Sequence, residues 1–265
     1  PVLTVMTEGA FLRDPLYNGL QLRKAKVSAH LHCLLTRDEI KEKSVEEIDE
    51  ILKDAFTFDN FARQYETKTE ITEAFRADGL HRILYKCACC GAEGKMVGSG
   101  TTLTCNECGK SWRMNTLGRL EAQNGKTEFD HIPDWYAWQR DCVKKELESD
   151  TYRLDTEVNI GIMRNYKAIY MVGDGRLTHD TDGFKLTGCD GKLNYEHAPT
   201  KSYGLYADYF WYEIGDVISI GNKDAIYYCF PKENAIVAKA RLAAEELYKI
   251  KKQTKTTMTA GVKNG

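Results

Sequence analysis

The pattern of apolar and polar positions predicts two strands and a helix at the start of the chain. Residues 1–11 form an apolar run typical of a buried strand, whereas residues 25–35 alternate apolar and polar positions, as a half-buried strand does. Thr36 and Ser44 are each followed by Glu three positions later, which is the spacing of a helix capping box. Two strands and a helix bury too little surface to fold alone, so we expect residues 1–56 to close a larger α/β unit.

Helical patterns lie on both sides of a cysteine-rich stretch. We predict one helical segment over residues 57–84 and a second helix within residues 127–150. Trp135 and Trp138 fall on the apolar stripe of the second helix, where packing in the core is their expected role. Residues 253–265 are polar, and we predict a disordered tail there.

Residues 151–252 have the pattern of a β-rich module closed by one helix. Runs rich in β-branched and aromatic residues predict strands, namely VNIGIM, AIYMVG, GFKLTG, LYADYFWYEI, VISIG and AIYYCF. Asn234 is placed to cap the helix that follows them, and its apolar face contains Val237, Ala240, Ala244 and Leu247. Strands followed by a helix predict a small antiparallel sheet or barrel plugged by that helix, an order similar to that of pleckstrin-homology-like folds. The expected fold class of the whole chain is α+β.

The length and net charge of the chain limit the number of domains and the kinds of protein it could be. The chain has 265 residues, enough for about two domains, and 37 basic against 39 acidic residues give a net charge of -2. This balance argues against a dedicated nucleic-acid binder, which usually carries a strong basic excess. The sequence has no apolar run of about 18 residues, the length of a membrane-spanning helix. It begins with Pro1 inside a strand-like run, so we expect further sequence upstream; a trimmed domain boundary is the alternative.

Cysteine usage indicates a metal site in a reducing compartment. Of nine cysteines, five cluster within residues 87–108, and the other four are scattered singly. An odd number with one tight cluster fits a metal site better than a disulfide framework. The cluster holds two CxxCG pairs, and the two residues between the thiolates let both sulfurs reach one ion. The predicted metal ligands are Cys87, Cys90, Cys105 and Cys108.

The spacing of the two CxxCG pairs predicts a zinc ribbon over residues 85–126. Two short strands can span the 14-residue spacer, and the glycine after each pair lets backbone N–H groups turn toward sulfur. Four thiolates suit tetrahedral Zn²⁺, and iron in a rubredoxin-like site is the alternative that spacing leaves open. Cys89 lies between the first two ligands and is expected to be a bystander.

We expect the metal to be structural. A catalytic zinc usually has three protein ligands and an open position, whereas four cysteines fill the coordination shell. Six basic against three acidic residues give residues 85–126 an excess of only +3, and basic and aromatic residues do not alternate there, so nucleic-acid readout is not expected.

Other candidates for catalysis are weak. His30 and His32 share one face of a predicted strand, where they could point to a site or lie on a surface. His179 has Asp180 and Asp182 as neighbours, but a turn between strands explains these residues better than an acid/base cluster. No nucleophile elbow, phosphate-binding loop or dinucleotide fingerprint is present in the sequence.

Several blocks, in order, resemble the C-terminal part of the lysophospholipid acyltransferase family, which includes bacterial 1-acyl-sn-glycerol-3-phosphate acyltransferases. Residues 1–5, PVLTV, are similar to its final P-V-V-P-V block, with Thr4 in place of Pro. The later blocks resemble a long C-terminal extension in a subset of these enzymes from anaerobic Gram-positive bacteria: YKCACCGAEGKM, LTCNECGKSW, FDHIPDWYAWQRDCV, GDGRLTHDTDGF and RLAAEELY. The resemblance covers most of the chain, and the ordered later series is its more specific part.

The resemblance implies an enzyme of phospholipid biosynthesis that transfers an acyl group to lysophosphatidate. The acyl donor would be acyl-CoA or acyl carrier protein, the partner surface would be the inner face of the cell membrane, and nucleic acid is not expected. The implied organisation is the end of the acyltransferase domain (1–56), a helical linker (57–84), the zinc ribbon (85–126), a helix (127–150), the β-rich module (151–252) and a tail (253–265).

The family's catalytic motifs do not occur in this sequence. They are H-x4-D, whose His acts as general base, and E-G-T-R, which binds phosphate; here Glu8 and Gly9 are followed by Ala10 and Phe11. We therefore assign no catalytic residue and expect the isolated chain to be inactive. The alternative is a non-enzymatic zinc-ribbon module that binds nucleic acid or protein.

Overall fold

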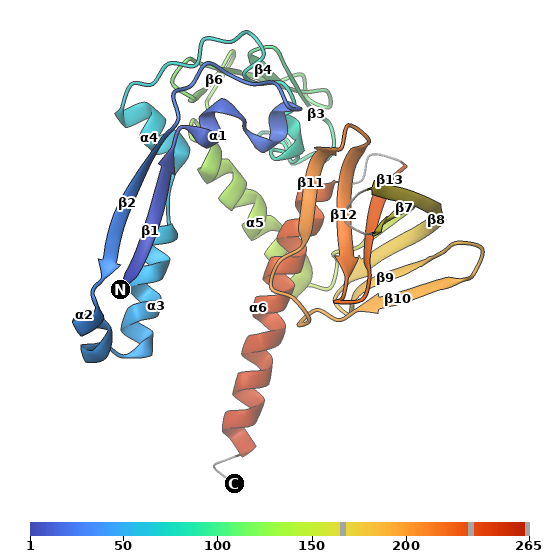
Figure 1. Cartoon of the computed structure of the whole chain (residues 1–265). Helices are drawn as coiled ribbons and strands as arrows, with labels where there is room; N and C mark the ends of the chain where they lie inside the picture. The colour runs from blue at the N-terminus through green and yellow to red at the C-terminus, as the bar shows by residue number, and fades with distance from the viewer. Residues whose placement is uncertain (165–167, 233–235, 263–265) are drawn as a thin grey trace.

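The structure is a computed structural model that describes residues 1–164, 168–232 and 236–262. It contains helices and three antiparallel sheets of two, four and seven strands, so the predicted α+β class is confirmed. The small sheets and most short helices come from the first half of the chain, whereas the seven-stranded sheet comes from the second half (Figure 1).

The N-terminal hairpin pairs β1 (Val2–Glu8) with β2 (Ser28–Leu35) and projects from the rest of the molecule (Figure 1). Helices α2 (Arg37–Glu42) and α3 (Val45–Phe56) follow it, and both predicted capping boxes are formed. The prediction of a buried first strand was wrong, because Leu3 and Val5 are 56% and 62% exposed. The described residues supply β1 with one neighbouring strand and no layer over its apolar face.

The expected helical segment over residues 57–84 is mostly irregular. It holds only α4 (Asn60–Glu66) and the 3-10 turn η2 (Leu80–Arg82). Between them, the N–H groups of Ile71, Ala77 and Gly79 donate to carbonyls of the ribbon, at Thr116, Gly100 and Gly98. Backbone groups that bond to a neighbouring sheet cannot also form helical bonds, which explains the failed prediction.

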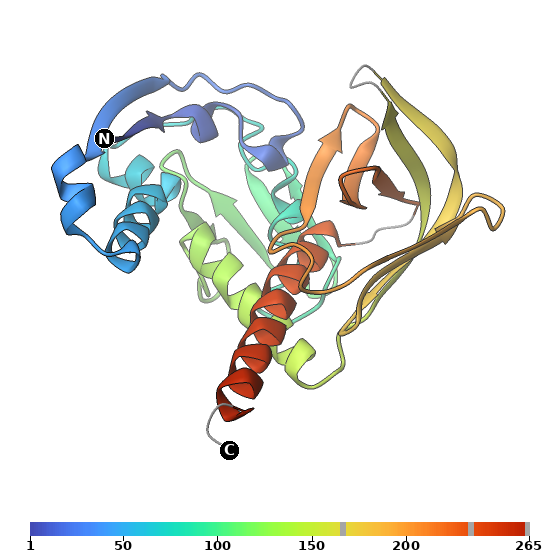
Figure 2. The same cartoon turned by 60° about the horizontal axis from the view of Figure 1, so that its bottom comes forward.

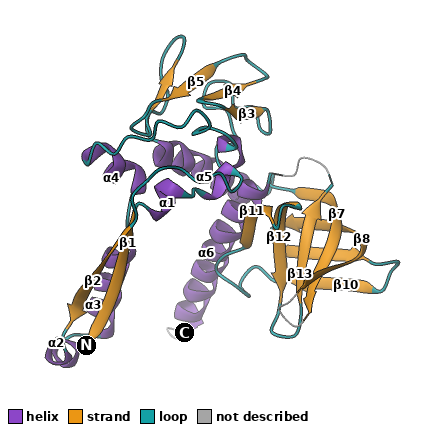
Figure 3. Cartoon of the chain, turned by 45° about the horizontal axis from the view of Figure 1, so that its top comes forward, coloured by secondary structure: helices purple, strands orange, loops and turns teal. Residues whose placement is uncertain are grey.

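The ribbon sheet has the strand order β3-β4-β5-β6 and lies above α5 in Figure 3. Its strands are β3 (Met96–Ser99), β4 (Thr102–Cys105), β5 (Ser111–Met114) and β6 (Leu120–Ala122). The first two are the strands predicted to span the spacer between the cysteine pairs. A short helix, α1 (Ala10–Arg13), and a 3-10 turn, η1 (Leu16–Asn18), pass close to this region, and η1 contacts η2.

Two long helices, α5 (Ile132–Glu148) and α6 (Val237–Val262), pack against each other between the ribbon and the large sheet (Figure 1). Trp135 is fully buried in α5, as predicted. The predicted disordered tail was wrong as far as Val262, because α6 continues through it; residues 263–265 lie outside the described residues. Extending a formed helix adds one hydrogen bond per residue, so polar composition alone does not end it.

The seven-stranded sheet has the order β10-β9-β8-β7-β13-β12-β11 and curves around the start of α6 (Figure 2). Pairing of β13 with β7 joins the last strand of the module to the first. All six predicted strands are present, and β10 was missed because LNYEH has few β-branched residues. The strands are β7 (Leu154–Arg164), β8 (Ala168–Asp180), β9 (Gly183–Gly188), β10 (Leu193–His197), β11 (Tyr206–Trp211), β12 (Gly215–Gly221) and β13 (Ile226–Pro231).

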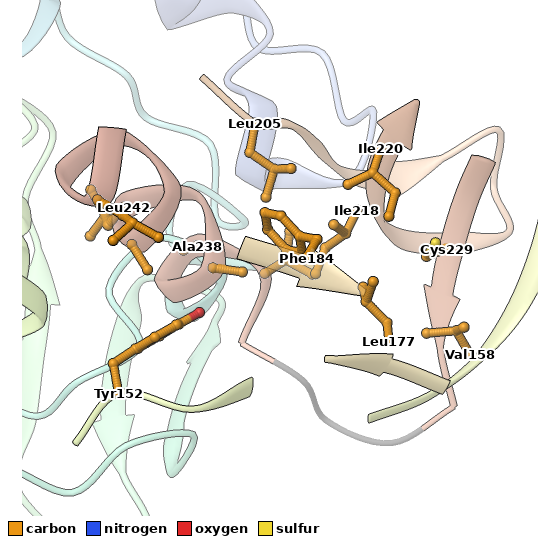
Figure 4. Close-up of a cluster of buried hydrophobic side chains, with 14 of the residues drawn as sticks. Tyr152, Val158, Leu177, Phe184, Leu205, Ile218, Ile220, Cys229, Ala238 and Leu242 are labelled. Carbon is orange, nitrogen blue, oxygen red and sulfur yellow. The ribbon is translucent and has the colours of Figure 1, made fainter. Parts of the chain in front are cut away.

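The largest core lies between the concave face of this sheet, α5 and α6. Figure 4 shows Phe184 of β9 among Leu205, Ile218 and Ala238, so strands and helix share one apolar interior. The helix thus plugs the sheet as the sequence predicted, through Val237, Ala240 and Leu247. The cap expected from Asn234 lies outside the described residues.

Candidate metal centre

Two tight turns place the four predicted ligands. In the first, the N–H of Gly91 donates to the carbonyl of Cys87 at 2.9 Å; in the second, the N–H of Gly109 donates to the carbonyl of Cys105 at 2.8 Å. Both glycines adopt left-handed backbone angles, with φ of 78° and 72°. Glycine takes this conformation without the steric cost that a side chain would add, which explains the CxxCG pattern.

The four sulfurs converge on one point. The Sγ atoms of Cys87 and Cys108 are 3.8 Å apart, as are those of Cys90 and Cys105. All four Sγ atoms lie within 4.8 Å of one another. Sulfurs about 2.3 Å from a tetrahedral ion are about 3.8 Å apart, so the spacing matches the geometry of a four-thiolate site. The sulfurs can therefore hold one metal ion.

Backbone N–H groups and burial set the charge of the thiols. The N–H of Lys110 lowers the pKa of Cys108 to about 7. Burial raises the pKa of Cys87, although the N–H groups of Cys90 and Cys89 oppose this by pointing at its sulfur. A bound cation would favour all four thiolates, so metal binding is expected to release protons and to weaken in acid.

The site is half-embedded in the apolar core of the ribbon. Cys87 and Cys105 are fully buried, whereas Cys90 and Cys108 are exposed. Trp112 of β5 packs edge-to-face on Trp135 of α5, with ring centroids 4.9 Å apart. This core therefore links the ligand-bearing turns to α5.

Helix α5 also fixes the backbone next to the first ligand. The indole N–H of Trp135 donates to the carbonyl of Lys86 at 2.9 Å. The side chain of Gln139, fully buried, accepts from the N–H of Lys86 and donates to the carbonyl of Ile83. The polar groups of Trp135 and Gln139 are thus satisfied by the backbone of the segment that leads into Cys87.

An ion-pair network joins the first cysteine turn to both long helices. The carboxylate of Glu93 lies 2.9 Å from the ammonium of Lys86 and 2.7 Å from that of Lys239 on α6. The carboxylate of Glu146 on α5 lies 2.7 Å from Lys239 and 3.7 Å from Lys86. Lys86 and Glu93 are seven residues apart, but Glu146 and Lys239 are distant from them in the sequence, so no local sequence pattern could predict this network.

The remaining candidates do not form a catalytic cluster among the described residues. His30 and His32 are exposed on β2, with ring centroids 6.5 Å apart. His179 is buried and bonds to the hydroxyl of Tyr152 rather than to its acidic neighbours. The N–H of Asp182 donates to the carboxylate of Asp180, which confirms the predicted turn.

Cys89 is exposed and lies outside the set of four converging sulfurs. The singly placed cysteines, Cys33, Cys142, Cys189 and Cys229, are free thiols far from the cluster in the sequence. Burial raises the pKa of Cys229 to about 12, so it behaves as a small apolar core residue.

Comparison of the chain with family models, curated proteins and solved structures gave no match. In the described part of the chain, none of the helices combines the length and apolar character needed to cross a bilayer.

Proposed function

We propose that Cys87, Cys90, Cys105 and Cys108 hold one structural Zn²⁺ that fixes the ribbon against α5. The observation that carries this proposal is the convergence of four sulfurs at distances that match a tetrahedral ion. Four thiolates leave no position for a substrate or water, which favours a structural role over a catalytic one.

Elemental analysis of purified protein tests the zinc site. We expect one zinc per chain in the wild type, strong loss of zinc in Cys105→Ser, and full retention in the matched control Cys89→Ser. Removing a structural zinc also removes folding free energy, so Cys105→Ser should unfold at lower temperature. Iron at the same stoichiometry would identify the alternative metal, and full zinc retention in Cys105→Ser would refute the ligand set.

We further propose that this chain is the C-terminal part of an acyltransferase that acylates lysophosphatidate. The resemblance of the ordered blocks, from PVLTV to RLAAEELY, carries this proposal. One structural observation supports it: Leu3, Val5 and Leu31 form an exposed apolar face on the N-terminal hairpin. Such a face is expected where two strands belong to a larger sheet with a covering layer.

Sequence upstream of Pro1 and an activity assay test the enzyme assignment together. The acyltransferase proposal requires an H-x4-D motif on the same polypeptide before Pro1, and acyl transfer to lysophosphatidate by that longer protein. The chain by itself should give no turnover with acyl-CoA or acyl carrier protein. A coding sequence that starts beside Pro1 would instead favour the non-enzymatic binding module.

A further inference from the structure

The segment from η1 to the start of β2 has two chemically distinct sides. Along its extended part, Arg23 and Ala25 are buried, whereas Leu22, Lys24 and Lys26 are exposed. An extended chain places alternate side chains on opposite sides, so one side faces the protein and the other faces solvent. In Figure 2 this part of the chain, drawn in blue, runs along the upper edge of the molecule. We call residues 15–27 the docking segment.

Buried polar contacts hold the docking segment in place. The guanidinium of Arg23, which is 2% exposed, donates to the side-chain oxygens of Asn18 and Tyr17 at 2.9 and 3.0 Å. It also donates to the carbonyl of Arg76 at 2.7 Å. Asn18 in turn donates to the carbonyls of Phe75 and Asp78. The outer side chains are therefore presented from an anchored backbone.

The outer side is apolar to an unusual degree. Leu20 and Leu22 are 60% and 57% exposed. Leu20 also has a left-handed backbone angle, with φ of 62°, a conformation that is sterically unfavourable for a residue other than glycine. An exposed leucine in a strained conformation contributes little to folding, and strain of this kind clusters at sites that bind something.

The charged residues of the docking segment itself, Arg23, Lys24 and Lys26, are all basic. No acidic residue lies between Asp14 and Asp38 in the sequence. Neither Lys24 nor Lys26 has a carboxylate partner for its ammonium among the described residues. The two carboxylates beside the segment bond to backbone or amide groups rather than to a lysine ammonium. Glu73 accepts from the N–H of Lys24, and Asp78 accepts from the N–H of Gly100 and from the side-chain amide of Gln21.

We propose that the docking segment binds the surface of a bilayer that contains anionic phospholipid, with its leucines inserted and its lysines on the headgroups. Exposed leucines beside lysines are the residue pattern of membrane-surface segments. A protein partner is disfavoured because the cores of protein interfaces are depleted of lysine. The hairpin face around Leu3, Val5 and Leu31 lacks lysine and fits a protein layer instead. The biological context of the membrane contact, a membrane-bound lysophosphatidate as substrate, rests on the proposed acyltransferase function.

Sedimentation of the chain with lipid vesicles tests this proposal. The probes are vesicles of phosphatidylcholine alone and vesicles with about one third phosphatidylglycerol. We expect binding to the anionic vesicles that weakens with salt. Leu20→Ser/Leu22→Ser should reduce the partition coefficient about tenfold or more, because exposed leucine area supplies the insertion energy. Lys24→Glu/Lys26→Glu should reduce it about tenfold on anionic vesicles and little on neutral ones.

Two control variants carry the same number and kind of substitutions outside the docking segment. Val5→Ser/Leu31→Ser removes two exposed apolar residues from the hairpin, and Lys126→Glu/Lys223→Glu makes the same charge change elsewhere; both should bind like the wild type. Circular dichroism and zinc content should stay unchanged in all four variants, since the altered side chains are exposed.

Three results would overturn the proposal: no binding to anionic vesicles, equal binding by the docking-segment and control variants, or self-association of the chain that Leu20→Ser/Leu22→Ser abolishes without any vesicle binding. None of them bears on the upstream catalytic motif, so failure of the membrane contact and failure of the enzyme assignment are distinguishable.

Discussion

His179 lies in the core of the β-rich module, with its ring stacked on Phe184 at a centroid distance of 3.6 Å. Its Nδ1 is 3.0 Å from the hydroxyl of Tyr152. Burial, assisted by the nearby charge of His197, lowers the pKa of His179 to about 3. Between these two pKa values, His179 is protonated in the unfolded chain, where its pKa is near 6.5, but neutral in the folded chain. The free energy of unfolding must therefore fall as the pH drops from about 6.5 toward 3. Above pH 6.5 His179 is neutral in both states, and this penalty is absent.

Replacing His179 by Phe should separate this effect from the other acid-sensitive groups. At pH 7 we expect a loss of about 1–3 kcal/mol in the free energy of unfolding, because the Tyr152 hydroxyl loses its partner in the core. Between pH 7 and pH 5, however, the variant should lose about 2 kcal/mol less than the wild type. Urea denaturation at the two pH values measures both quantities.

Tyr152→Phe is the matched control for this measurement. It removes the same hydrogen bond but keeps the imidazole, so it should retain the steep loss of stability in acid. If His179→Phe and the wild type lose the same free energy between pH 7 and pH 5, buried His179 does not control the acid response.

The ligand cysteines and His179 show which residue roles a sequence can give. The CxxCG turns are local, so the spacing of Cys87, Cys90, Cys105 and Cys108 was enough to predict that their sulfurs converge. His179 has an equally suggestive local setting, beside two aspartates, but its surroundings come from other elements. Only the fold shows that it faces Tyr152 and Phe184 rather than its neighbours in the sequence.

At the scale of elements, local signals predicted helix starts well and helix extents poorly. The capping boxes at Thr36 and Ser44 formed because each satisfies its own backbone within one turn. Residues 57–84 failed as one helix because their N–H groups bond to the ribbon, a partner absent from any local window. Helix α6 exceeded its predicted end because each added residue of a formed helix gains a hydrogen bond, and no proline interrupts the chain between Val237 and Val262.

The packing of α5 and α6 depends on pairs that are distant in sequence. Glu93, near the first cysteine turn, meets Lys239 at a separation of 146 residues. Glu146 contacts the same ammonium from α5. Together with Lys86, these residues make four charged side chains, each mostly buried and each with partners of opposite sign, which is how charges are tolerated inside a protein. The network links the ribbon to the β-rich module, a contact that could not be predicted from the sequence of either part alone.

At the scale of the whole molecule, apolar surface is distributed unevenly. The β-rich module encloses its large core around α6, whereas the N-terminal hairpin leaves one face bare. Register explains why this face is apolar: Leu3 pairs with Cys33 and Val5 pairs with Leu31, so these side chains emerge on the same side. A two-stranded sheet with an uncovered apolar face is marginally stable in water.

Hydrogen exchange should reveal this difference. In the chain alone, we expect the amides of β1 and β2 to exchange far faster than those of β12 and β13, because local opening of the hairpin exposes little buried surface. In a longer protein that includes the proposed upstream domain, the hairpin amides should become strongly protected, while the amides of β12 and β13 serve as the control and stay unchanged. The expected cause is pairing and coverage of the Leu3, Val5 and Leu31 face by that domain. Hairpin amides that are already as protected in the chain alone as those of β12 and β13 would show that the hairpin needs no covering layer, and the structural support for an upstream acyltransferase domain would then be lost.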